Sequence, residues 1–223
     1  MSQMDTPPKL KTILFDFDGT LIDASEVICQ SFNHALGSIG MAPLPDDVIR
    51  FGIGRPLREI FLEHVREERL EEVLQAYREE FFRISLSGSR LIPGVRTLVP
   101  KLARDYRLGI VTSRTSGSVR LLTDHFGLTQ FFGSVIGIAE VRKSKPAAEP
   151  ILQALSELET EPAQAAMVGD TIHDILAARA AGTLAVGVAS GAHSRSALLE
   201  AGAVRVLESV AGLPEFLASE SLD

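Results

Sequence analysis

Two acidic side chains follow the first apolar segment of the chain. Asp16 and Asp18 are separated by one residue and come directly after Ile13–Phe15, a run that predicts a buried strand. In doubly wound sheets ligands bind beyond the carboxyl ends of the strands, and Gly19 allows a tight turn whose amides can meet an anion. Asp16 could then act as a nucleophile and Asp18 as a general acid, provided that a cation keeps Asp16 ionised. An ordinary Asp-Gly turn is the alternative.

A second acidic pair, Asp170 and Asp174, follows the apolar run Ala165–Val168. Mg²⁺ prefers oxygen ligands and is commonly held by one or two carboxylates, with water and substrate phosphate completing its shell. Asp16 and Asp170 would supply those carboxylates if their strands are neighbours. Asp174 lies one helical turn beyond Asp170 and would act on the metal directly or through water. Capping of a helix N-terminus is the other role for this pair, and it does not exclude metal binding.

Two further positions could complete a phosphate site. Thr112 follows the apolar run Leu108–Val111, so its hydroxyl could donate to a phosphate oxygen. Lys145 precedes Pro146, which we expect to be the first residue of a helix, and its ammonium could offset phosphate and carboxylate charge. Taken alone, these are a polar strand end and a solvated lysine. Their order in the chain beside the acidic pairs is what makes them candidates.

Four apolar segments must position these side chains. Each is followed by small or polar residues and then by a helical pattern, which predicts βαβ units and a doubly wound parallel sheet, an α/β fold. Val135–Ile138 is a weaker candidate for another strand, and Arg205–Leu207 for an edge strand. The four segments are Thr12–Phe15, Leu108–Val111, Ala165–Val168 and Leu184–Val188.

The pattern between the first and second of these strands is helical. Apolar residues recur at helical spacing from Ser25 to Ile39, and a later stretch repeats the pattern. That stretch contains Leu70, Val73, Leu74, Tyr77 and Phe81. No strand is expected between Leu21 and Arg90, and Ser85–Ser89 is expected to be a hinge or linker. We therefore predict a helical domain at residues 21–91, inserted into an α/β core made of residues 1–20 and 92–223.

The composition is that of an ordinary globular protein, with 45% hydrophobic residues among 223. Its 22 basic and 29 acidic residues give a formal net charge of −7, which argues against a nucleic-acid-binding surface. Cys29 is the only cysteine, so no intrachain disulfide can form. No apolar run reaches the roughly 18 residues of a membrane helix, so a cytoplasmic protein without a membrane partner is the default expectation.

Four blocks, in this order, resemble the motifs of the haloacid dehalogenase-like superfamily of phosphotransferases. The DFDGTL of Asp16–Leu21 is similar to the first motif, Thr112 to the second, Lys145 to the third and the GDTIHD of Gly169–Asp174 to the fourth. The resemblance spans the core from residue 12 to about 188. The helical insert resembles the family's cap, and the KSKPAAEP of Lys143–Pro150 resembles the phosphoglycolate phosphatase-like branch. A Rossmann-like core with a helical cap is the fold that this implies.

The resemblance also implies a two-step phosphatase reaction on a small phosphorylated metabolite. Asp16 would attack phosphorus and form an aspartyl-phosphate, with Mg²⁺ held by the Asp16 carboxylate, the Asp18 backbone carbonyl and Asp170. Asp18 would protonate the leaving oxygen and then activate water. Thr112 and Lys145 would hold the phosphoryl group, and Lys145 would also orient Asp16. The true dehalogenases lack the second aspartate, so Asp18 argues against halide chemistry.

Further contacts with substrate follow from the same resemblance. Ser113 and Arg114 occupy positions at which family members contact phosphate through a backbone amide or a side chain. Gly52–Pro56 resembles the loop that reaches the active site in cap-bearing relatives. Arg55 within it is a candidate for contact with a substrate carboxylate or a second phosphate. A helix-start turn before Pro56 is the alternative.

Several functions stay open at this point. Phosphoglycolate is the substrate that the branch favours, followed by pyrophosphate and a nucleoside or sugar monophosphate. A β-phosphoglucomutase-type mutase would need a polar sugar-binding segment in the cap, and none is evident. A non-enzymatic aspartate phospho-switch fits less well, because receiver domains are shorter and carry the phosphorylated aspartate on a later strand. The chain is expected to be a monomer or a homodimer.

Overall fold

Six strands form one sheet in the computed structural model, which describes residues 9–220. Their order is β5-β4-β1-β6-β7-β8, and every neighbouring pair is parallel. The predicted α/β fold, its four main strands and its edge strand are therefore confirmed. The strands are β1 Thr12–Phe15, β4 Arg107–Val111, β5 Phe132–Ile136, β6 Ala165–Gly169, β7 Leu184–Val188 and β8 Arg205–Leu207.

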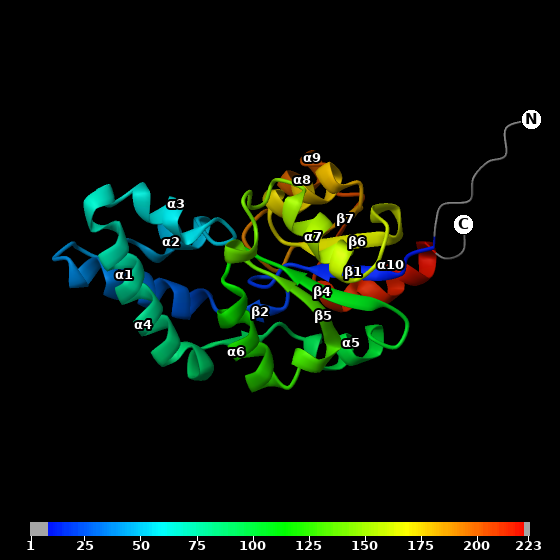
Figure 1. Cartoon of the computed structure of the whole chain (residues 1–223), viewed down its shortest axis with the longest axis horizontal. Helices are drawn as coiled ribbons and strands as arrows, with labels where there is room; N and C mark the ends of the chain where they lie inside the picture. Colours follow the sequence, from blue (N-terminus) through cyan, green and yellow to red (C-terminus); the bar gives the residue numbers. More distant parts are fainter. Residues whose placement is uncertain (1–8, 221–223) are drawn as a thin grey trace, which may run out of the picture.

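Helices cover both faces of this sheet (Figure 1). Side chains of β1 alternate between the two layers: Ile13 and Phe15 join the buried cluster on one face, and Leu14 joins the cluster on the other. The first face is covered by α5 Val95–Leu102, α6 Ser116–Phe126 and α10 Leu213–Glu220. The second is covered by α7 Glu149–Glu157, α8 Ile172–Ala181 and α9 Arg195–Glu200.

The central position of β1 decides where the acidic residues meet. Its last residue, Phe15, is paired with Ile110 of β4 and with Val168 of β6. The chain therefore leaves these three strands at the same edge of the sheet, within one or two residues of each other. Asp16, Thr112 and Asp170 are the polar residues at these three strand ends.

Four further helices lie beyond one end of the sheet (Figure 1, blue to teal). These are α1 Ser25–Ser38, α2 Asp46–Phe51, α3 Leu57–Leu62 and α4 Leu70–Gly88, here called the helical group. Two short antiparallel strands, β2 Ile22–Asp23 and β3 Arg90–Leu91, lie at its connections to the sheet. The expectation of no strand in this stretch was therefore wrong, because two residues are too few to show alternation. The boundaries of the predicted inserted domain stay a prediction.

The expected hinge at Ser85–Ser89 is also wrong, because α4 continues to Gly88. Ser85 is fully buried, and a Cβ atom at Gly88 would lie 2.5 Å from Cγ2 of Val27 on α1. The small residues thus let α4 approach α1 closely. Their composition indicated a flexible linker, whereas their actual role is packing.

Two further boundaries differ from prediction. The strand expected at Val135–Ile138 is β5, which ends at Ile136 because the chain turns at Gly137, whose amide donates to the Glu140 carboxylate at 2.9 Å. The helix expected to start at Pro146 begins three residues later, at Glu149. Pro150 takes the early position in the first turn, where the missing amide hydrogen does no harm.

The interior of the helical group is organised around stacked rings. Phe32 and Phe61 have ring centroids 4.0 Å apart and nearly parallel planes, and Tyr77 meets Phe61 edge-on at 6.0 Å. Phe32 and Phe61 are almost completely buried. Their burial, and not a surface network, must supply most of the stability of this part of the chain, because exposed ion pairs contribute little. Arg58–Glu71 and Arg69–Glu72 are pairs of that exposed kind.

We expect Phe61→Ala to lower the free energy of unfolding by about 3–5 kcal/mol, since it removes a buried ring and leaves a cavity. Urea denaturation of the purified variant measures this directly. Phe82→Ala is the matched control, because Phe82 is 68% exposed on α4. Equal losses in the two variants would contradict the assignment of Phe61 to the interior.

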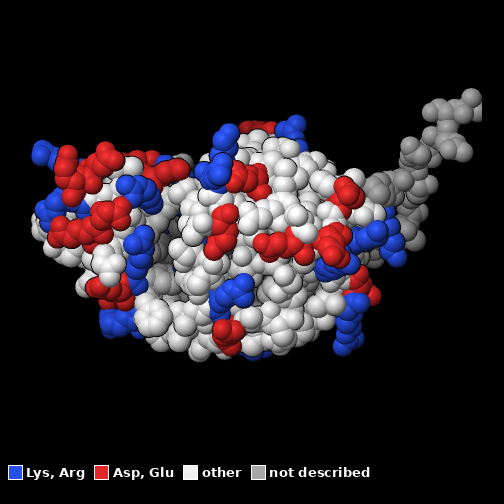
Figure 2. All heavy atoms as spheres, in the orientation of Figure 1, with Lys and Arg blue, Asp and Glu red and all other residues white. Residues whose placement is uncertain are grey.

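Charged side chains of both signs are interspersed over the helical group on the face shown in Figure 2. This mixture fits the small excess of acidic residues in the sequence. Among the described residues, no helix is both long enough and apolar enough to cross a membrane.

Candidate functional site

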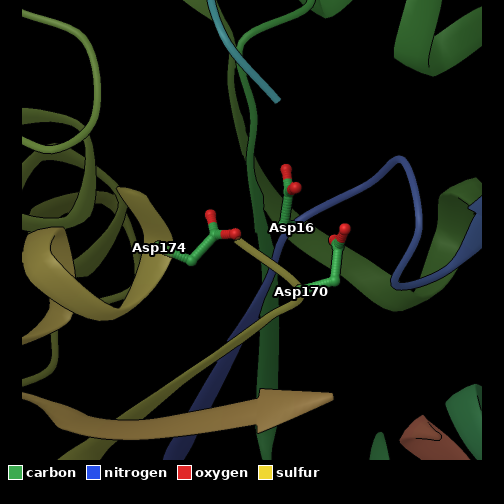
Figure 3. A group of neighbouring side chains, drawn as sticks. All are labelled: Asp16, Asp170 and Asp174. Carbon is green, nitrogen blue, oxygen red and sulfur yellow. The ribbon is translucent and has the colours of Figure 1, made fainter. Parts of the chain in front are cut away.

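Three carboxylates converge at the edge of the sheet where β1 and β6 end (Figure 3). Asp16 follows β1, Asp170 follows β6, and Asp174 lies in the first turn of α8. One oxygen from each lies within 4.8 Å of the others, and all three residues are at most 2% exposed. The structure thus brings Asp16 of the first acidic pair to the second pair, which follows about 150 residues later in the chain.

Lys145 joins two of these carboxylates. Its ammonium donates to Oδ1 of Asp16 at 2.9 Å and to Oδ1 of Asp174 at 2.6 Å, and its third hydrogen bond, at 3.1 Å, goes to the backbone oxygen of Val111. An ammonium has three donors, so all are used within the protein. Lys145 therefore orients Asp16 and neutralises carboxylate charge, and it is not a solvated surface lysine.

Burial and mutual repulsion dominate the electrostatics of the cluster. Burial raises the pKa of Asp16 well above its ordinary value, the charge of Asp174 adds to this, and Lys145 opposes it. The pKa of Asp170 rises to about 7, chiefly through burial and then through Asp174. Burial lowers the pKa of Lys145, but Asp16 and Asp174 outweigh it and the net shift is upward. A further positive charge would lower the pKa values of Asp16 and Asp170 and so favour their ionised forms.

The arrangement fits a divalent cation. Oδ2 of Asp16 is buried and has no hydrogen-bond partner among the described residues. When all four are ionised, the carboxylates of Asp16, Asp18, Asp170 and Asp174 carry two more charges than the two cations that pair with them, Lys145 and Arg114. Clustered carboxylate oxygens with an open lone pair are the donor set that Mg²⁺ prefers.

Asp170 is held firmly in this cluster. Thr20 donates its hydroxyl to Oδ1 at 2.9 Å, and the backbone amide of Ala192 donates to Oδ2 at 2.9 Å. Gly19 and Gly191 press against the same carboxylate, and a Cβ atom at either position would overlap it. Neither Thr20 nor Ala192 was predicted from the sequence to contact Asp170. Thr20 lies inside the first acidic block and was a reasonable candidate, whereas the loop that contains Ala192 carries no chemical signal.

Asp174 also caps its helix. Its Oδ2 accepts from the backbone amide of Thr171 at 3.0 Å and from the Thr171 hydroxyl at 2.7 Å. The capping role considered for this block is therefore present together with the contact to Lys145. Both oxygens of Asp174 already accept hydrogen bonds from the protein.

The predicted phosphate-contacting residues lie at the rim of this cluster. Thr112 is buried, and its hydroxyl oxygen accepts from the backbone amide of Arg114 at 3.2 Å, which leaves its hydrogen free to donate. The hydroxyl of Ser113 donates to the backbone oxygen of Gly54 at 2.6 Å, so the Gly52–Pro56 loop does reach the core. Arg55 pairs with Glu63 at 2.5 Å, and among the described residues it pairs with no carboxylate of the cluster.

Asp18 is occupied by a guanidinium. Nη2 of Arg114 donates to Oδ1 at 2.7 Å and Nε of Arg114 donates to Oδ2, so the pair is bidentate. Each side chain is 11% exposed. Beside Asp18 and Asp170 lies a cavity of about 220 Å³, which is lined by residues of the core and of the helical group, including Ile28, Arg50 and Ile53.

Comparison with known proteins identifies the family. The sequence model of the haloacid dehalogenase-like hydrolases matches residues 13–188, which include both acidic pairs. The chain belongs to this family. It is therefore a hydrolase, and its fold and its motif blocks agree with the resemblance drawn from the sequence.

Several similar proteins of the haloacid dehalogenase-like family are named as phosphatases or pyrophosphatases. The chain is 38% identical to pyrophosphatase PpaX of Anoxybacillus flavithermus over 81% of its length and 84% of the relative's. It is 36% identical to PpaX of Bacillus velezensis over 86% of this chain and 90% of that one. A solved structure described as a predicted phosphatase from Clostridium acetobutylicum superposes with a TM-score of 0.86 at 25% identity, covering 95% of this chain and all of that one. The chain is accordingly a phosphatase of the haloacid dehalogenase-like family.

Proposed function

We propose that the protein hydrolyses small phosphate esters through an aspartyl-phosphate on Asp16, with Mg²⁺ as cofactor. The observation that carries the proposal is the buried, unpartnered Oδ2 of Asp16 at the centre of the carboxylate cluster. Lys145 fixes the other oxygen of this carboxylate, so Oδ2 is the atom available to the substrate and the cation.

The metal would be held by Asp16, Asp170 and the backbone carbonyl of Asp18, with Asp174 acting through water because its oxygens already accept hydrogen bonds. When bound, Mg²⁺ supplies positive charge that keeps Asp16 ionised and offsets the negative charge of the phosphoryl oxygens. The remaining chemistry belongs to the side chains.

In the first step an oxygen of Asp16 attacks phosphorus, and the bond from phosphorus to the leaving oxygen breaks. Asp18 donates a proton to that oxygen, which leaves as an alcohol. In the second step a water molecule gives a proton back to Asp18 and attacks phosphorus, which releases inorganic phosphate and restores Asp16. Thr112 donates to a phosphoryl oxygen, while Ser113 contacts the phosphoryl group through its backbone amide. Lys145 keeps the attacking carboxylate in line.

Substrate choice would depend on the residues that close over this cluster. We assign that role to the inserted region at residues 21–91, acting as a cap, because its Gly54 meets Ser113 of the core at 2.6 Å. Phosphoglycolate is the first candidate substrate. Pyrophosphate is the second, and the names of the PpaX relatives favour it. Arg55 would have to leave Glu63 in order to contact either substrate.

A phosphate-release assay tests the proposal. The full chain is incubated with Mg²⁺ and with p-nitrophenyl phosphate, 2-phosphoglycolate or pyrophosphate, and inorganic phosphate is measured. We expect turnover that stops when EDTA removes the metal. An absence of phosphate release from every substrate would contradict the proposal. Incubation with β-glucose 1-phosphate and a trace of the bisphosphate distinguishes a phosphomutase, which would form glucose 6-phosphate and release little phosphate.

We expect Mg²⁺ to raise the melting temperature at pH 8 by roughly 5 °C when its concentration is about 100 times its Kd, and much less at pH 5. Burial and then Asp174 raise the pKa of Asp170 to about 7, so its proton must leave before a cation binds. Without metal, the stability linked to this carboxyl is fully present below its unfolded pKa near 4 and is lost as the pH rises through about 7. Mg²⁺ restores it above that pH.

Thermal unfolding at both pH values, with and without Mg²⁺, measures the effect. Asp170→Asn is the matched variant and should show no shift at pH 8. A shift of the same size at pH 5, or in Asp170→Asn, would place the metal elsewhere.

A further inference from the structure

The backbone and the guanidinium of Arg114 are held in a position suited to binding an anion. It follows Thr112 and Ser113 at the end of β4, and its backbone is fixed on both sides: its amide donates to Thr112 Oγ1 at 3.2 Å, and its carbonyl accepts from Ile138 at 2.8 Å. The guanidinium carbon lies 4.4 Å from the ring centroid of Phe81 on α4. The guanidinium is thus placed between the core and the helical group.

Its hydrogen bonds are incompletely used. Nε and Nη2 donate to the two oxygens of Asp18, whereas Nη1 donates to no other described residue. Guanidinium is the side chain best suited to a forked contact with a carboxylate or a phosphate. Asp18 is the only carboxylate that pairs with it among residues 9–220. Asp18 therefore occupies a guanidinium that could equally bind another carboxylate or a phosphate.

The pair also blocks Asp18. Proton transfer to a leaving oxygen requires a carboxyl oxygen within about 2.6–3.2 Å of it, with a free direction of approach. In this structure each oxygen of Asp18 receives a hydrogen bond from Arg114 instead. Asp18 borders the 220 Å³ cavity, so the space for a leaving group lies beside it once the pair opens.

Contact between the helical group and the core does not open the pair. Ser113 already donates to Gly54, and Phe81 already covers the guanidinium, while Asp18 is still bound. The event that frees Asp18 must therefore be competition for the guanidinium. Only another anion offers comparable hydrogen bonds, because a neutral group would leave the buried charge of Arg114 without a partner.

We propose that Arg114 sets substrate specificity by exchanging anions: it holds Asp18 in a resting ion pair and releases it when a second anionic group of the substrate, a carboxylate or a phosphate, takes its place. Substrates whose leaving group carries that charge are then processed efficiently, and esters of neutral alcohols are processed poorly. This inference rests on the proposed phosphatase function and on the role of Asp18 within it.

Steady-state kinetics of the Mg²⁺-loaded full chain test the exchange. 2-Phosphoglycolate and ethyl phosphate have the same number of carbon atoms and differ in the carboxylate, while pyrophosphate supplies the phosphate version. We expect kcat/KM of the wild-type protein to be about 10- to 100-fold higher for the two anionic substrates, the range expected for charge-assisted hydrogen bonds. Arg114→Met should lower kcat/KM for the two anionic substrates and so bring it close to the value for ethyl phosphate.

Arg114→Lys keeps the positive charge but loses the two parallel N–H donors of the guanidinium. It should retain part of the preference for anionic substrates. Arg120→Met, at an exposed position on α6, is the matched control and should behave as wild type. Equal losses on charged and neutral substrates in Arg114→Met would overturn the proposal and indicate a merely structural role. A preference that survives in Arg114→Met would overturn it as well. If kcat/KM of Arg114→Met falls for pyrophosphate alone, the site binds a phosphate. If it falls for 2-phosphoglycolate alone, the site binds a carboxylate.

A crystal structure with Mg²⁺ and imidodiphosphate provides a measurement that does not depend on a variant that folds. We expect Arg114 to bind the phosphoryl group that is not at Asp16, and Asp18 to have left the guanidinium. A complex in which the Arg114–Asp18 pair is intact would end the proposal. Failure of the phosphatase function itself looks different, because the wild-type protein would then release phosphate from none of these substrates.

Discussion

Asp16→Asn is expected to lower kcat for phosphate release by roughly 10³-fold or more, because an amide cannot form the covalent intermediate. The change preserves the size of the side chain and its place at the end of β1. The loss should be equal for 2-phosphoglycolate, pyrophosphate and p-nitrophenyl phosphate, since all three would react at the same carboxylate. Residual phosphate release with these substrates, followed over hours, measures the effect.

The thermal stability of Asp16→Asn should not fall together with its activity. Burial, and then Asp174, raise the pKa of Asp16, so its ionised form is disfavoured in the metal-free fold. The stability linked to a carboxyl of raised pKa is lost as the pH rises through its folded value. At pH 8 without metal, Asp16→Asn should therefore melt no lower than the wild-type protein.

Asp47→Asn, at an exposed position of α2, is the matched control and should change neither activity nor melting temperature. Activity retained in Asp16→Asn would remove Asp16 as the nucleophile. A large fall in its melting temperature would instead show that the loss of activity reflects misfolding.

Lys145→Met is expected to destabilise the protein by about 3–5 kcal/mol, in addition to abolishing activity, because it leaves buried carboxylates without their cation. Asp16 and Asp174 both accept hydrogen bonds from this ammonium, at 2.9 and 2.6 Å, and neither can reach bulk water. The pKa of Lys145 is raised in the fold, so its contribution is present throughout the neutral range and is lost only in strong alkali. Urea denaturation at pH 7.5 without metal gives the free energy of unfolding.

The double variant Lys145→Met/Asp174→Asn separates charge from packing. Removing one of the stranded carboxylates should recover part of the lost stability, but none of the activity. Lys143→Met is the control, because Lys143 is exposed two residues earlier. A Lys145→Met protein as stable as the wild type would show that the carboxylates are neutral in the metal-free fold and need no cation.

The positions of the acidic residues could be predicted because the sheet obeys a simple rule. Asp16, Thr112 and Asp170 each follow an apolar run, and parallel strands present their carboxyl ends at one edge. Periodicity alone did not show that β1 lies between β4 and β6. The family resemblance implied only that Asp16 and Asp170 hold one cation together, and the pairing of Phe15 with Ile110 and with Val168 is what places β1 between the other two strands.

Side-chain partners were much harder to predict. Arg114 and Asp18 were each singled out, yet they lie 96 positions apart and nothing in the sequence joins them. Ala192 supports Asp170 through its backbone amide, a contact that no side-chain type reveals. Ser85 and Gly88 resembled a linker by composition, but their small size serves the packing of α4 on α1. Local chemistry identified candidates, and three-dimensional packing chose among their possible roles.

The central position of the first strand affects how the protein is made. β1 leaves the ribosome first, yet its partner β6 and the Asp170 that completes the cluster emerge about 150 residues later. At about 5–20 residues per second, this interval lasts roughly 8–30 seconds. During translation the apolar first strand therefore lacks one of its neighbours for this interval, and the cluster of Asp16, Asp170 and Asp174 can form only after β6 has emerged.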